Sequence, residues 1–234
     1  MLVLITTRCL EGCSHCLHDA RPDGMDMEEA TLSEVILFLT VVKSKLIQIS
    51  GGEPTLHPRF QHFITRVAKT FKSTLVLIES NGSFIDDPAR KSQMLKVLML
   101  PNVALQIRTH PQYYPNYERT INNFDLRMLP KTKIFTDCIR IFPIGRAAGM
   151  QPEIMYSSCV NTYLLALQRP RHTITQMIPV LQEHKRFCSP MIDPEGVLHA
   201  GESRLCTSLG HVADPLRVLD TKPCGKCGLS SPEV

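Results

Sequence analysis

Short apolar runs alternate with amphipathic segments over about the first 140 residues of the chain. Five runs rich in aliphatic and β-branched residues predict strands, at 2–6, 46–50, 74–79, 103–107 and 132–142. Three segments with apolar residues at helical spacing predict helices, at 59–71, 87–100 and, more weakly, 117–129. Thr31 and Glu34 have the spacing of a capping box and predict one more helix, whose apolar pattern begins at Val35.

This alternation predicts parallel strands joined by right-handed helical crossovers. About five or six such units are too few to close an eight-stranded barrel. We therefore expect an α/β fold with a partial, open (β/α)5–6 barrel over residues 1–185. From about residue 186 the alternation stops, and a small loop-rich extension is expected over 186–234. Ligands of such sheets bind at the carboxyl ends of the strands.

The composition is that of a folded chain. Hydrophobic residues make up 43% of the 234 residues and charged residues 21%. No apolar run reaches the roughly 18–20 residues of a membrane span, and the N-terminus lacks the basic stretch and long apolar run of a signal peptide. We therefore expect a cytoplasmic protein without membrane contact. The net charge of +4 favours an anionic substrate or nucleic acid only weakly.

Nine cysteines are a high count for a reducing compartment, where thiols serve as metal ligands more often than as disulfides. Cys9, Cys13 and Cys16 stand in the stretch CLEGCSHC, with three residues in the first gap and two in the second. Three thiolates at this spacing can bind three corners of a 4Fe–4S cube and leave the fourth iron open to a ligand. A zinc site and a chance spacing are the alternatives.

Two further motifs follow the cysteines along the chain. Gly51, Gly52 and Glu53 end the predicted second strand in ISGGEPTLHP. Ser80 and Asn81 end the third strand in ESNGS. Together with the cysteine spacing, these motifs resemble those of the radical S-adenosylmethionine (radical SAM) superfamily, with its GGE motif and SNG turn. Taken singly, each is also compatible with an ordinary turn after a strand.

The resemblance implies a shared first step. The reduced cluster would pass one electron to S-adenosylmethionine, and the resulting 5′-deoxyadenosyl radical would remove a hydrogen atom from the substrate. It further implies that the three cysteines hold the cluster, and that the GGE motif and the turn at Ser80 and Asn81 bind S-adenosylmethionine. His15 takes the position beside the adenine, or is an ordinary loop residue. An external donor such as flavodoxin or ferredoxin would supply the electron.

Four further cysteines lie in the predicted extension. Cys188 and Cys206, with Gly201 between them, resemble the C-x(9–15)-G-x4-C opening of the SPASM and Twitch extensions of the same superfamily. Cys224 and Cys227 supply a C-x2-C pair. The resemblance to the shorter Twitch form implies one auxiliary 4Fe–4S cluster without an open site, and therefore two clusters in all. A four-thiolate zinc site is the competing interpretation.

Several residues are candidates for the substrate end of the site. Arg108 and His110 lie at or just past the end of the predicted fourth strand, where polar side chains face the reaction chamber. Arg146 lies in FPIGRAAG, which resembles the PxGRA turn of SPASM-type enzymes and would pair with a carboxylate. Cys138 would donate a hydrogen atom to a substrate radical, or is a buried, inert thiol. Ordinary surface roles remain open for both arginines and His110.

Three functional hypotheses follow. The first is a radical SAM enzyme with one auxiliary cluster that oxidises or rearranges a small or nucleotide-like substrate, nucleic-acid-borne substrates included. The second is a peptide-modifying enzyme of the same superfamily; such enzymes usually carry a leader-binding domain or a full SPASM tail, which we do not expect here. The third is a non-catalytic iron–sulfur or zinc protein.

Overall fold

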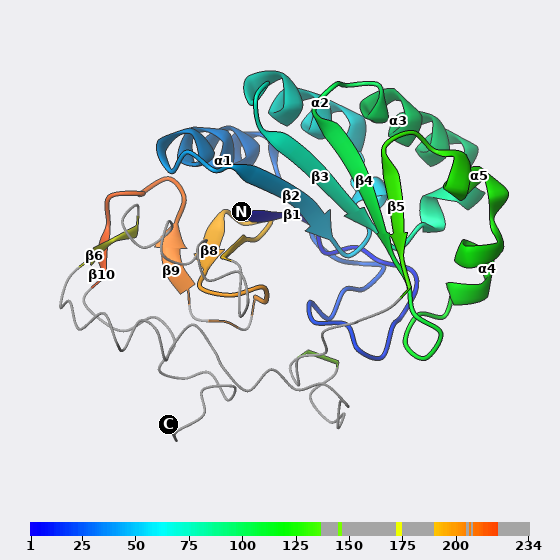
Figure 1. Cartoon of the computed structure of the whole chain (residues 1–234). Helices are drawn as coiled ribbons and strands as arrows, with labels where there is room; N and C mark the ends of the chain where they lie inside the picture. The colour runs from blue at the N-terminus through cyan, green and yellow to red at the C-terminus, as the bar shows by residue number, and fades with distance from the viewer. Residues whose placement is uncertain (137–144, 147–171, 175–189, 205, 207, 220–234) are drawn as a thin grey trace, which may run out of the picture.

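A computed structural model describes residues 1–136, 145–146, 172–174, 190–204, 206 and 208–219 (Figure 1). The last part of the predicted strand over 132–142 therefore lies outside the described residues, as does Cys138. Of the four cysteines predicted in the extension, Cys206 alone belongs to the described part.

Five parallel strands, β1 to β5, form one side of the eight-stranded main sheet. Their bounds are β1 Leu2–Thr6, β2 Leu46–Gly51, β3 Leu75–Ser80, β4 Val103–Arg108 and β5 Thr132–Phe135. They lie in the order β5-β4-β3-β2-β1, each parallel to its neighbour. Burial alternates along β2, β3 and most of β4, so that one set of side chains enters the core and the other lines the opposite face. The hydrophobic pattern predicted these five strands.

Helices cover one face of these strands (Figure 1). Their bounds are α1 Glu29–Val41, α2 Phe60–Thr70, α3 Pro88–Leu98, α4 Tyr117–Asn122 and α5 Phe124–Met128, with 3-10 helices η1 Pro54–Leu56 and η2 Ser83–Asp86. The start of α3 is well specified, because Asp87 accepts hydrogen bonds from the N–H groups of Ala89 and Arg90 and Pro88 occupies the first turn.

The capping-box prediction for α1 was wrong. The helix begins at Glu29, and its N-cap residue Glu28 makes no side-chain hydrogen bond to the helix. Thr31 and Glu34 therefore lie inside the first turns rather than at the boundary. The Met27 N–H donates to the carbonyl of Ile5 at 2.8 Å, which holds the chain against β1 until just before the helix starts. A tertiary hydrogen bond thus sets this boundary.

The weak helix predicted over 117–129 is two short helices, α4 and α5. Asn123 separates them with an extended backbone (φ −78°, ψ 109°). Its side chain accepts a hydrogen bond from the N–H of Leu126 and so caps α5. A capping residue inside an amphipathic pattern explains why the periodicity was weak.

One hydrophobic core lies between the helices and the sheet. Its largest fully buried side chains include Phe38 of α1, Phe60 and Phe63 of α2 and Phe84 of η2. Each buries apolar area that stabilises the fold by roughly 1.5–3 kcal/mol. On the opposite face of the sheet, Leu2, Leu4 and Met191 form a small separate cluster.

The described part of the C-terminal region adds three strands to the other edge of β1. They are β7 Met191–Ile192, β8 Val197–His199 and β9 Ser208–His211. Strand β7 is parallel to β1, whereas β8 and β9 are antiparallel to their neighbours. The main sheet therefore has the order β5-β4-β3-β2-β1-β7-β8-β9. Strands β6 His172–Thr173 and β10 Val218–Leu219 form a separate antiparallel pair.

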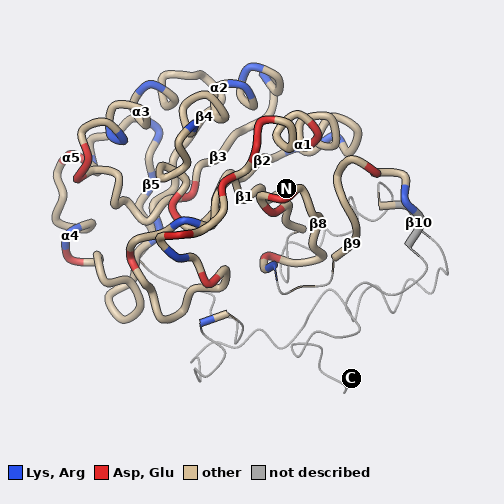
Figure 2. Tube along the Cα trace, turned by 180° about the vertical axis from the view of Figure 1, so that it is seen from behind, with Lys and Arg blue, Asp and Glu red and all other residues tan. Residues whose placement is uncertain are grey.

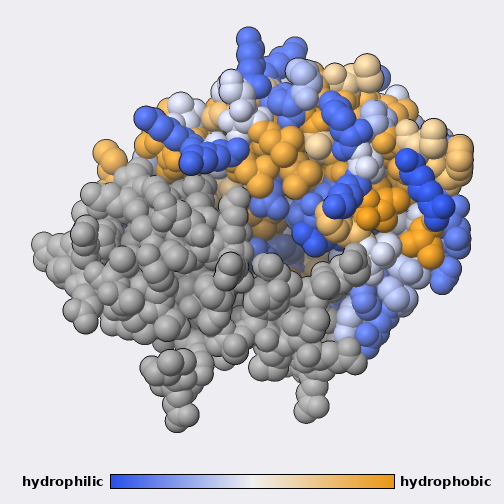
Figure 3. Space-filling view, viewed as in Figure 1, coloured by the Kyte–Doolittle hydropathy of each residue, from blue (hydrophilic) through white to orange (hydrophobic). Residues whose placement is uncertain are grey.

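Charges of both signs are spread over the described surface. Seen from behind, Lys and Arg alternate with Asp and Glu over the helices and near the centre of the molecule (Figure 2). The opposite view is hollowed near its centre, and the described side chains visible in the hollow are largely hydrophilic (Figure 3). Among the described helices, none combines the length and the apolar character that a membrane crossing requires.

Candidate functional site

The three N-terminal cysteines lie together on the loop between β1 and α1, which we call the cysteine loop (residues 7–28). Hydrogen bonds fold this loop back on itself: the Cys9 N–H donates to the Arg21 carbonyl at 2.9 Å, and the Arg21 N–H donates to the Thr7 carbonyl at 3.1 Å. Cys9 and Cys13 are buried, and Cys16 is half-buried. The loop begins at the carboxyl end of β1, as predicted.

The three thiols are close enough to influence one another electrostatically. Burial, together with the neighbouring Cys9 and Cys16, raises the pKa of Cys13 to about 12. Burial also raises the pKa of Cys9. Thiols in such a setting are protonated at neutral pH. A metal centre that binds them as thiolates must therefore supply positive charge and release protons.

The three thiols are a donor set for an iron–sulfur cluster. In a 4Fe–4S cube each of three cysteine thiolates binds a different iron, and the fourth iron stays open to a ligand. Cys9, Cys13 and Cys16 all lie on the loop that begins at the carboxyl end of β1. By the chemistry of the donor set, these residues fit the cube.

Two N–H groups point at the sulfurs. The side-chain amide of Asn81 donates to the Cys9 sulfur at 3.7 Å, and the Ala20 N–H donates to the Cys16 sulfur at 3.4 Å. Hydrogen bonds of this kind stabilise negative charge on a ligating sulfur and help to set a cluster's potential. Asn81, predicted as a contact of S-adenosylmethionine, therefore contacts a cysteine of the triad.

The two glycines of the GGE motif let the end of β2 lie against the cysteine loop. A Cβ atom on Gly51 would stand 2.2 Å from the carbonyl oxygen of Thr6, and one on Gly52 would stand 2.0 Å from that of Arg8. The backbone of this segment is paired as closely, because the Glu53 N–H donates to the Arg8 carbonyl at 2.7 Å. Glycine is required here by the neighbouring backbone.

Glu53 is fully buried, and its carboxylate is occupied by donors from the protein. One oxygen accepts from the hydroxyl and N–H of Thr55, at 2.7 and 3.3 Å. The other accepts from the Ser80 hydroxyl at 2.8 Å and the Asn81 N–H at 3.0 Å. Burial raises the pKa of Glu53, and these hydrogen bonds oppose the rise. The carboxylate joins the end of β2 to the end of β3, so the motifs GGE and SNG form one unit.

His15 lies in a group of aromatic rings that follows β4. Its ring centroid is 4.6 Å from that of Tyr114 and 5.5 Å from that of Tyr113, and Tyr113 stacks on His110 at 5.0 Å. Burial lowers the pKa of His15 to about 4, so the imidazole is neutral. The structure therefore brings His15 and His110 together through two tyrosines. Sequence reasoning missed these tyrosines because their only signal was their place after a strand end.

Arg108 lies on the sheet face opposite the helices, next to Glu79. Its guanidinium is 3.4 Å from the Glu79 carboxylate, which also accepts from Gln106 at 3.3 Å. The guanidinium carbon stands over the Phe135 ring at 5.7 Å from the centroid. These contacts bring together side chains of β3, β4 and β5, and the role of Arg108 at the substrate stays a prediction.

Arg146 supports the cysteine loop from a distant part of the sequence. Its guanidinium donates to the carbonyls of Cys13 and Ala20, both at 2.8 Å, and its N–H donates to the Cys16 carbonyl at 3.1 Å. A Cβ on Gly145 would stand 2.6 Å from the same Cys16 oxygen. The predicted pairing of Arg146 with a ligand carboxylate is therefore not its main contact in the structure: it binds loop carbonyls.

The hairpin of β7 and β8 places Cys206 near the cysteine loop. The hydroxyl of Ser203 donates to the Leu17 carbonyl at 3.3 Å, and the Cys206 N–H donates to the Ser203 carbonyl at 2.9 Å. His199 contacts the Cys206 carbonyl at 3.1 Å through one ring nitrogen. Cys206 is thus connected through Ser203 to the residue that follows Cys16.

A model of the radical SAM superfamily matches residues 3–125, just over half of the chain. The chain belongs to the radical SAM superfamily. Membership implies a 4Fe–4S cluster and S-adenosylmethionine, and the three cysteines of the loop are the thiolate donors that suit such a cluster. The matched segment spans β1 to the start of α5 and so contains the cysteine loop, the GGE motif and the aromatic rings.

Known proteins resemble the chain in part. A GTP 3′,8-cyclase of Chlorobaculum tepidum is 28% identical over 85 residues, which cover 36% of this chain and 26% of that protein. The chain thus matches about a quarter of the length of this curated relative. BtrN in complex with AdoMet and 2-DOIA has a similar fold, with a TM-score of 0.58, 14% identity and coverage of 92% of this chain and 78% of BtrN.

Streptococcus suis SuiB bound to its precursor peptide SuiA also shares the fold. The TM-score is 0.53 at 12% identity, with coverage of 84% of this chain and 58% of SuiB. At these identities the likeness concerns the fold, which supports the partial barrel predicted from the strand–helix alternation. The division into residues 1–185 and 186–234 stays a prediction.

Proposed function

We propose that the protein is a radical SAM enzyme that cleaves S-adenosylmethionine reductively and removes a hydrogen atom from a small or nucleoside-type substrate, which is then oxidised or rearranged. The observation that carries the proposal is the joint placement of Cys9, Cys13, Cys16 and the Asn81 amide at the carboxyl edge of the sheet. When bound there, a reduced 4Fe–4S cluster supplies the electron that splits the sulfonium and yields the 5′-deoxyadenosyl radical.

The chain's own residues would prepare this site in three ways. Asn81 and the Ala20 N–H stabilise charge on the sulfurs. Arg146 holds the carbonyls of Cys13 and Ala20 and brings a positive charge beside the loop. Glu53 keeps the turn at Asn81 in place by accepting from it and from Ser80. These contacts orient the loop before any ligand binds, which lowers the cost of binding.

The aromatic rings would wall the cofactor site and exclude water. His15 and Tyr114 lie against each other at the start of the chamber, and burial keeps His15 neutral. A neutral imidazole and a phenol offer flat apolar faces together with hydrogen-bonding edges, which suits a purine. Arg108 and Glu79 lie beyond them and would bind the polar part of the cofactor or substrate.

An auxiliary 4Fe–4S cluster held by Cys188, Cys206, Cys224 and Cys227 is part of the proposal. It is supported by the cysteine spacing and by the connection of Cys206 to the cysteine loop through Ser203. A cluster with four thiolate ligands has no open iron, so it would transfer electrons rather than bind substrate. An external one-electron donor of the flavodoxin or ferredoxin type would reduce the first cluster.

The test is anaerobic reconstitution of the full chain, followed by iron analysis and by assay of 5′-deoxyadenosine with S-adenosylmethionine and dithionite. Two clusters predict about eight irons per chain. Cys13→Ser should abolish 5′-deoxyadenosine. The matched variant Cys206→Ser should lose about half of the iron but retain cleavage. Iron without any 5′-deoxyadenosine in the wild type would refute the activity, and about four irons plus zinc would refute the auxiliary cluster.

A further inference from the structure

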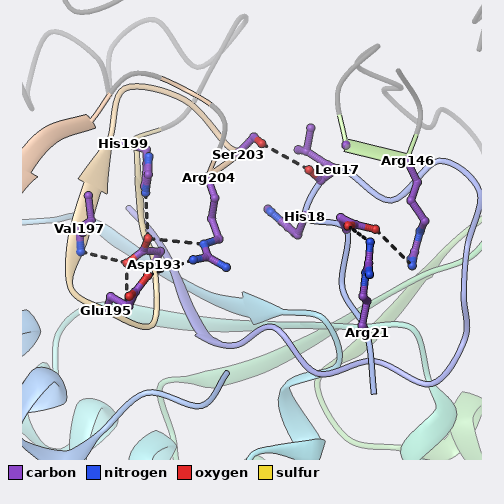
Figure 4. A pocket seen from close by; sticks show the side chains of 12 residues that line it. Leu17, His18, Arg21, Arg146, Asp193, Glu195, Val197, His199, Ser203 and Arg204 are labelled. Atoms are coloured by element: carbon purple, nitrogen blue, oxygen red, sulfur yellow. Dashed lines mark hydrogen bonds and ion pairs between the residues drawn. The ribbon is translucent and has the colours of Figure 1, made fainter. Parts of the chain in front are cut away.

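A pocket of about 780 Å³ lies between the cysteine loop and the β7–β8 hairpin, and we call it the loop–hairpin pocket (Figure 4). His18 lies on its loop side and Arg204 on its hairpin side. The pocket reaches the loop directly after Cys16, because Leu17 is part of its wall. Its volume is that of a site for a small organic molecule.

The wall of the pocket is polar. Leu17 and Val197 are its only large apolar residues among the described ones, and the rest of the wall is charged, histidine, serine or glycine. Sites for drug-like ligands are mostly apolar with a few polar groups. The reverse proportion in the loop–hairpin pocket suits a ligand that presents hydrogen-bonding groups on most of its surface.

On the loop side, the positive charges are balanced. The guanidinium of Arg21 is 2.7 Å from the Asp19 carboxylate, and that of Arg146 is 3.8 Å from the same carboxylate. Arg146 is further held by the loop carbonyls that it binds. Both guanidinium groups are therefore already engaged by oxygens of the protein.

On the hairpin side, Arg204 is balanced in the same way. It stands 3.0 Å from the Glu195 carboxylate and 3.6 Å from that of Asp193. The three arginines of the wall thus face three carboxylates, and the described wall has no excess of positive charge. A phosphate or carboxylate ligand would have to displace a paired acidic side chain, so the electrostatics do not favour an anion.

Three polar atoms of the wall residues lack a hydrogen-bond partner in the described structure. They are Nδ1 of His18, Oδ1 of Asp19 and Nη2 of Arg146, and all three are shielded from water. Such atoms are rare, and each calls for a partner. The set combines a donor, an acceptor and an imidazole nitrogen. A ligand whose neighbouring hydroxyl groups both donate and accept can satisfy all three after small side-chain rotations.

We propose that the loop–hairpin pocket binds the substrate, and that it recognises a neutral polyhydroxylated ring such as a cyclitol or the sugar of an unphosphorylated nucleoside. This assignment rests on the proposed function for the reaction, but it concerns binding alone. It also narrows the substrate class, since the net charge of the chain had pointed weakly to an anion. The pocket's place beside Cys16 would bring the ring close to the site where the radical forms.

The experiment measures binding to the reconstituted full chain in the presence of S-adenosylmethionine, by isothermal titration calorimetry. The probes are two matched pairs: myo-inositol with its 1-phosphate, and uridine with uridine 5′-monophosphate. At least one neutral probe should bind saturably, and its phosphate should bind no tighter. Glu195→Gln leaves Arg204 with one partner fewer and should improve binding of the phosphate relative to the neutral probe by about fivefold, as one unpaired surface charge would.

The control variant is Asp125→Asn, which removes a carboxylate paired with Lys91 on the helices and should leave every affinity unchanged. Three results would overturn the assignment: no binding of either neutral probe, binding of a phosphate more than tenfold tighter than its neutral partner, or an unchanged affinity ratio in Glu195→Gln. The 5′-deoxyadenosine assay of the wild type and of Asp125→Asn separates this outcome from the proposed function: cleavage of S-adenosylmethionine without binding of either neutral probe overturns the pocket assignment alone, whereas loss of cleavage overturns the proposed function.

Discussion

The strands on the two sides of β1 differ in length and in the contacts that hold them. On one side, β2 to β5 are parallel strands of four to six residues that share a core of phenylalanine and aliphatic side chains with the helices. On the other side, β7 and β8 are strands of two and three residues, joined by a turn that polar side chains hold together. The hydrophobic core extends under both sides, because Ile192 and Leu198 belong to it, and on the second side hydrogen bonds to Asp193 also hold the turn.

Both sides of β1 contact the cysteine loop, and together they fix its position. The parallel side presents rigid strand ends, where Gly52 and Glu53 contact the start of the cysteine loop. The C-terminal side contacts the middle of the same loop, where the Ser203 hydroxyl donates to the Leu17 carbonyl. A loop that is held by strand ends on one side and by hydrogen bonds on the other can fix the positions of its cysteines. The part of the loop where a ligand enters can still change conformation.

The largest effect is expected from Gly52→Ala on the parallel side. Its Cβ would meet the Arg8 carbonyl at 2.0 Å, and a backbone atom cannot rotate away. We expect a loss of roughly 3–5 kcal/mol in the free energy of unfolding and of most iron binding, measured by urea unfolding and iron analysis. The control is Gly12→Ala, where a Cβ meets no atom within 4 Å but the backbone φ is +60°, so a loss of only about 1 kcal/mol is expected. Equal behaviour of the two variants would contradict the packing role of Gly52.

The next effect tests the hairpin side. Asp193 accepts from the N–H groups of Glu195 and Val197 and from His199, each at 3.0 Å. Asp193→Ala leaves these groups without a partner, which should cost about 2–3 kcal/mol locally. Hydrogen exchange should accelerate in β7 and β8 and stay unchanged in β2 to β4.

Asp193→Asn keeps an acceptor for the two N–H groups and should cost less than half as much. Should Asp193→Ala instead speed exchange uniformly over the whole sheet, the two sides would be one cooperative unit, and the contrast between them would not hold.

A smaller effect concerns the potential of the cluster in the loop. Asn81→Ala removes the N–H group that points at the Cys9 sulfur. Loss of a hydrogen bond to sulfur disfavours the reduced state, and a bond worth about 1 kcal/mol corresponds to a decrease of roughly 40 mV for one electron. An EPR-monitored redox titration measures it. Asn116→Ala, which removes a donor to the Asn81 carbonyl and no donor to sulfur, should leave the potential unchanged; an equal drop there would refute the hydrogen-bond explanation.

The smallest effect is a pH dependence on the parallel side. Burial lowers the pKa of His57, whose Nε2 faces the Met27 carbonyl at 3.0 Å and whose Nδ1 accepts from the Arg59 N–H at 3.0 Å. A second proton on Nδ1 would oppose that N–H. Because the unfolded chain binds this proton more readily, the stabilisation is complete above pH about 6.5 and decreases as the pH falls below it.

His57→Gln should therefore be less sensitive to acidification than the wild type, with a difference below about 1 kcal/mol between pH 7.5 and 5.5. Urea unfolding at the two pH values measures it. An identical decrease in both proteins would mean that other groups account for the whole acid sensitivity.

Much of the parallel side was predictable from the sequence. Alternating residues such as Ile47 and Ile49 specify a strand locally, and the motifs at the strand ends specify a shared edge. The start of α1 could not be predicted from the sequence, because the hydrogen bond from the Met27 N–H to the Ile5 carbonyl is a tertiary contact. Strands β7 and β8 could not be predicted either, because two or three residues are too few to show periodicity. They form strands only by pairing, β7 with β1 and β8 with β7 and β9.

The site was predictable in its residues and less so in their roles. The spacing of the cysteines identified them, but Glu53 could not be recognised as a fully paired carboxylate, since its partners Ser80 and Asn81 lie on another strand. Arg146 reads as a ligand for a carboxylate until the fold brings it to the loop carbonyls. The sequence shows the charge of each side chain, whereas tertiary packing determines which group that side chain binds.

The central place of β1 has a consequence for the order of events during synthesis. One edge of β1 pairs with β2 soon after both leave the ribosome, while its other edge needs Met191 and Ile192, nearly the whole chain later. Until then, β1 carries an open edge beside the cysteine loop. The hairpin can therefore cover this edge only after the parallel half and the cysteine loop have been synthesised.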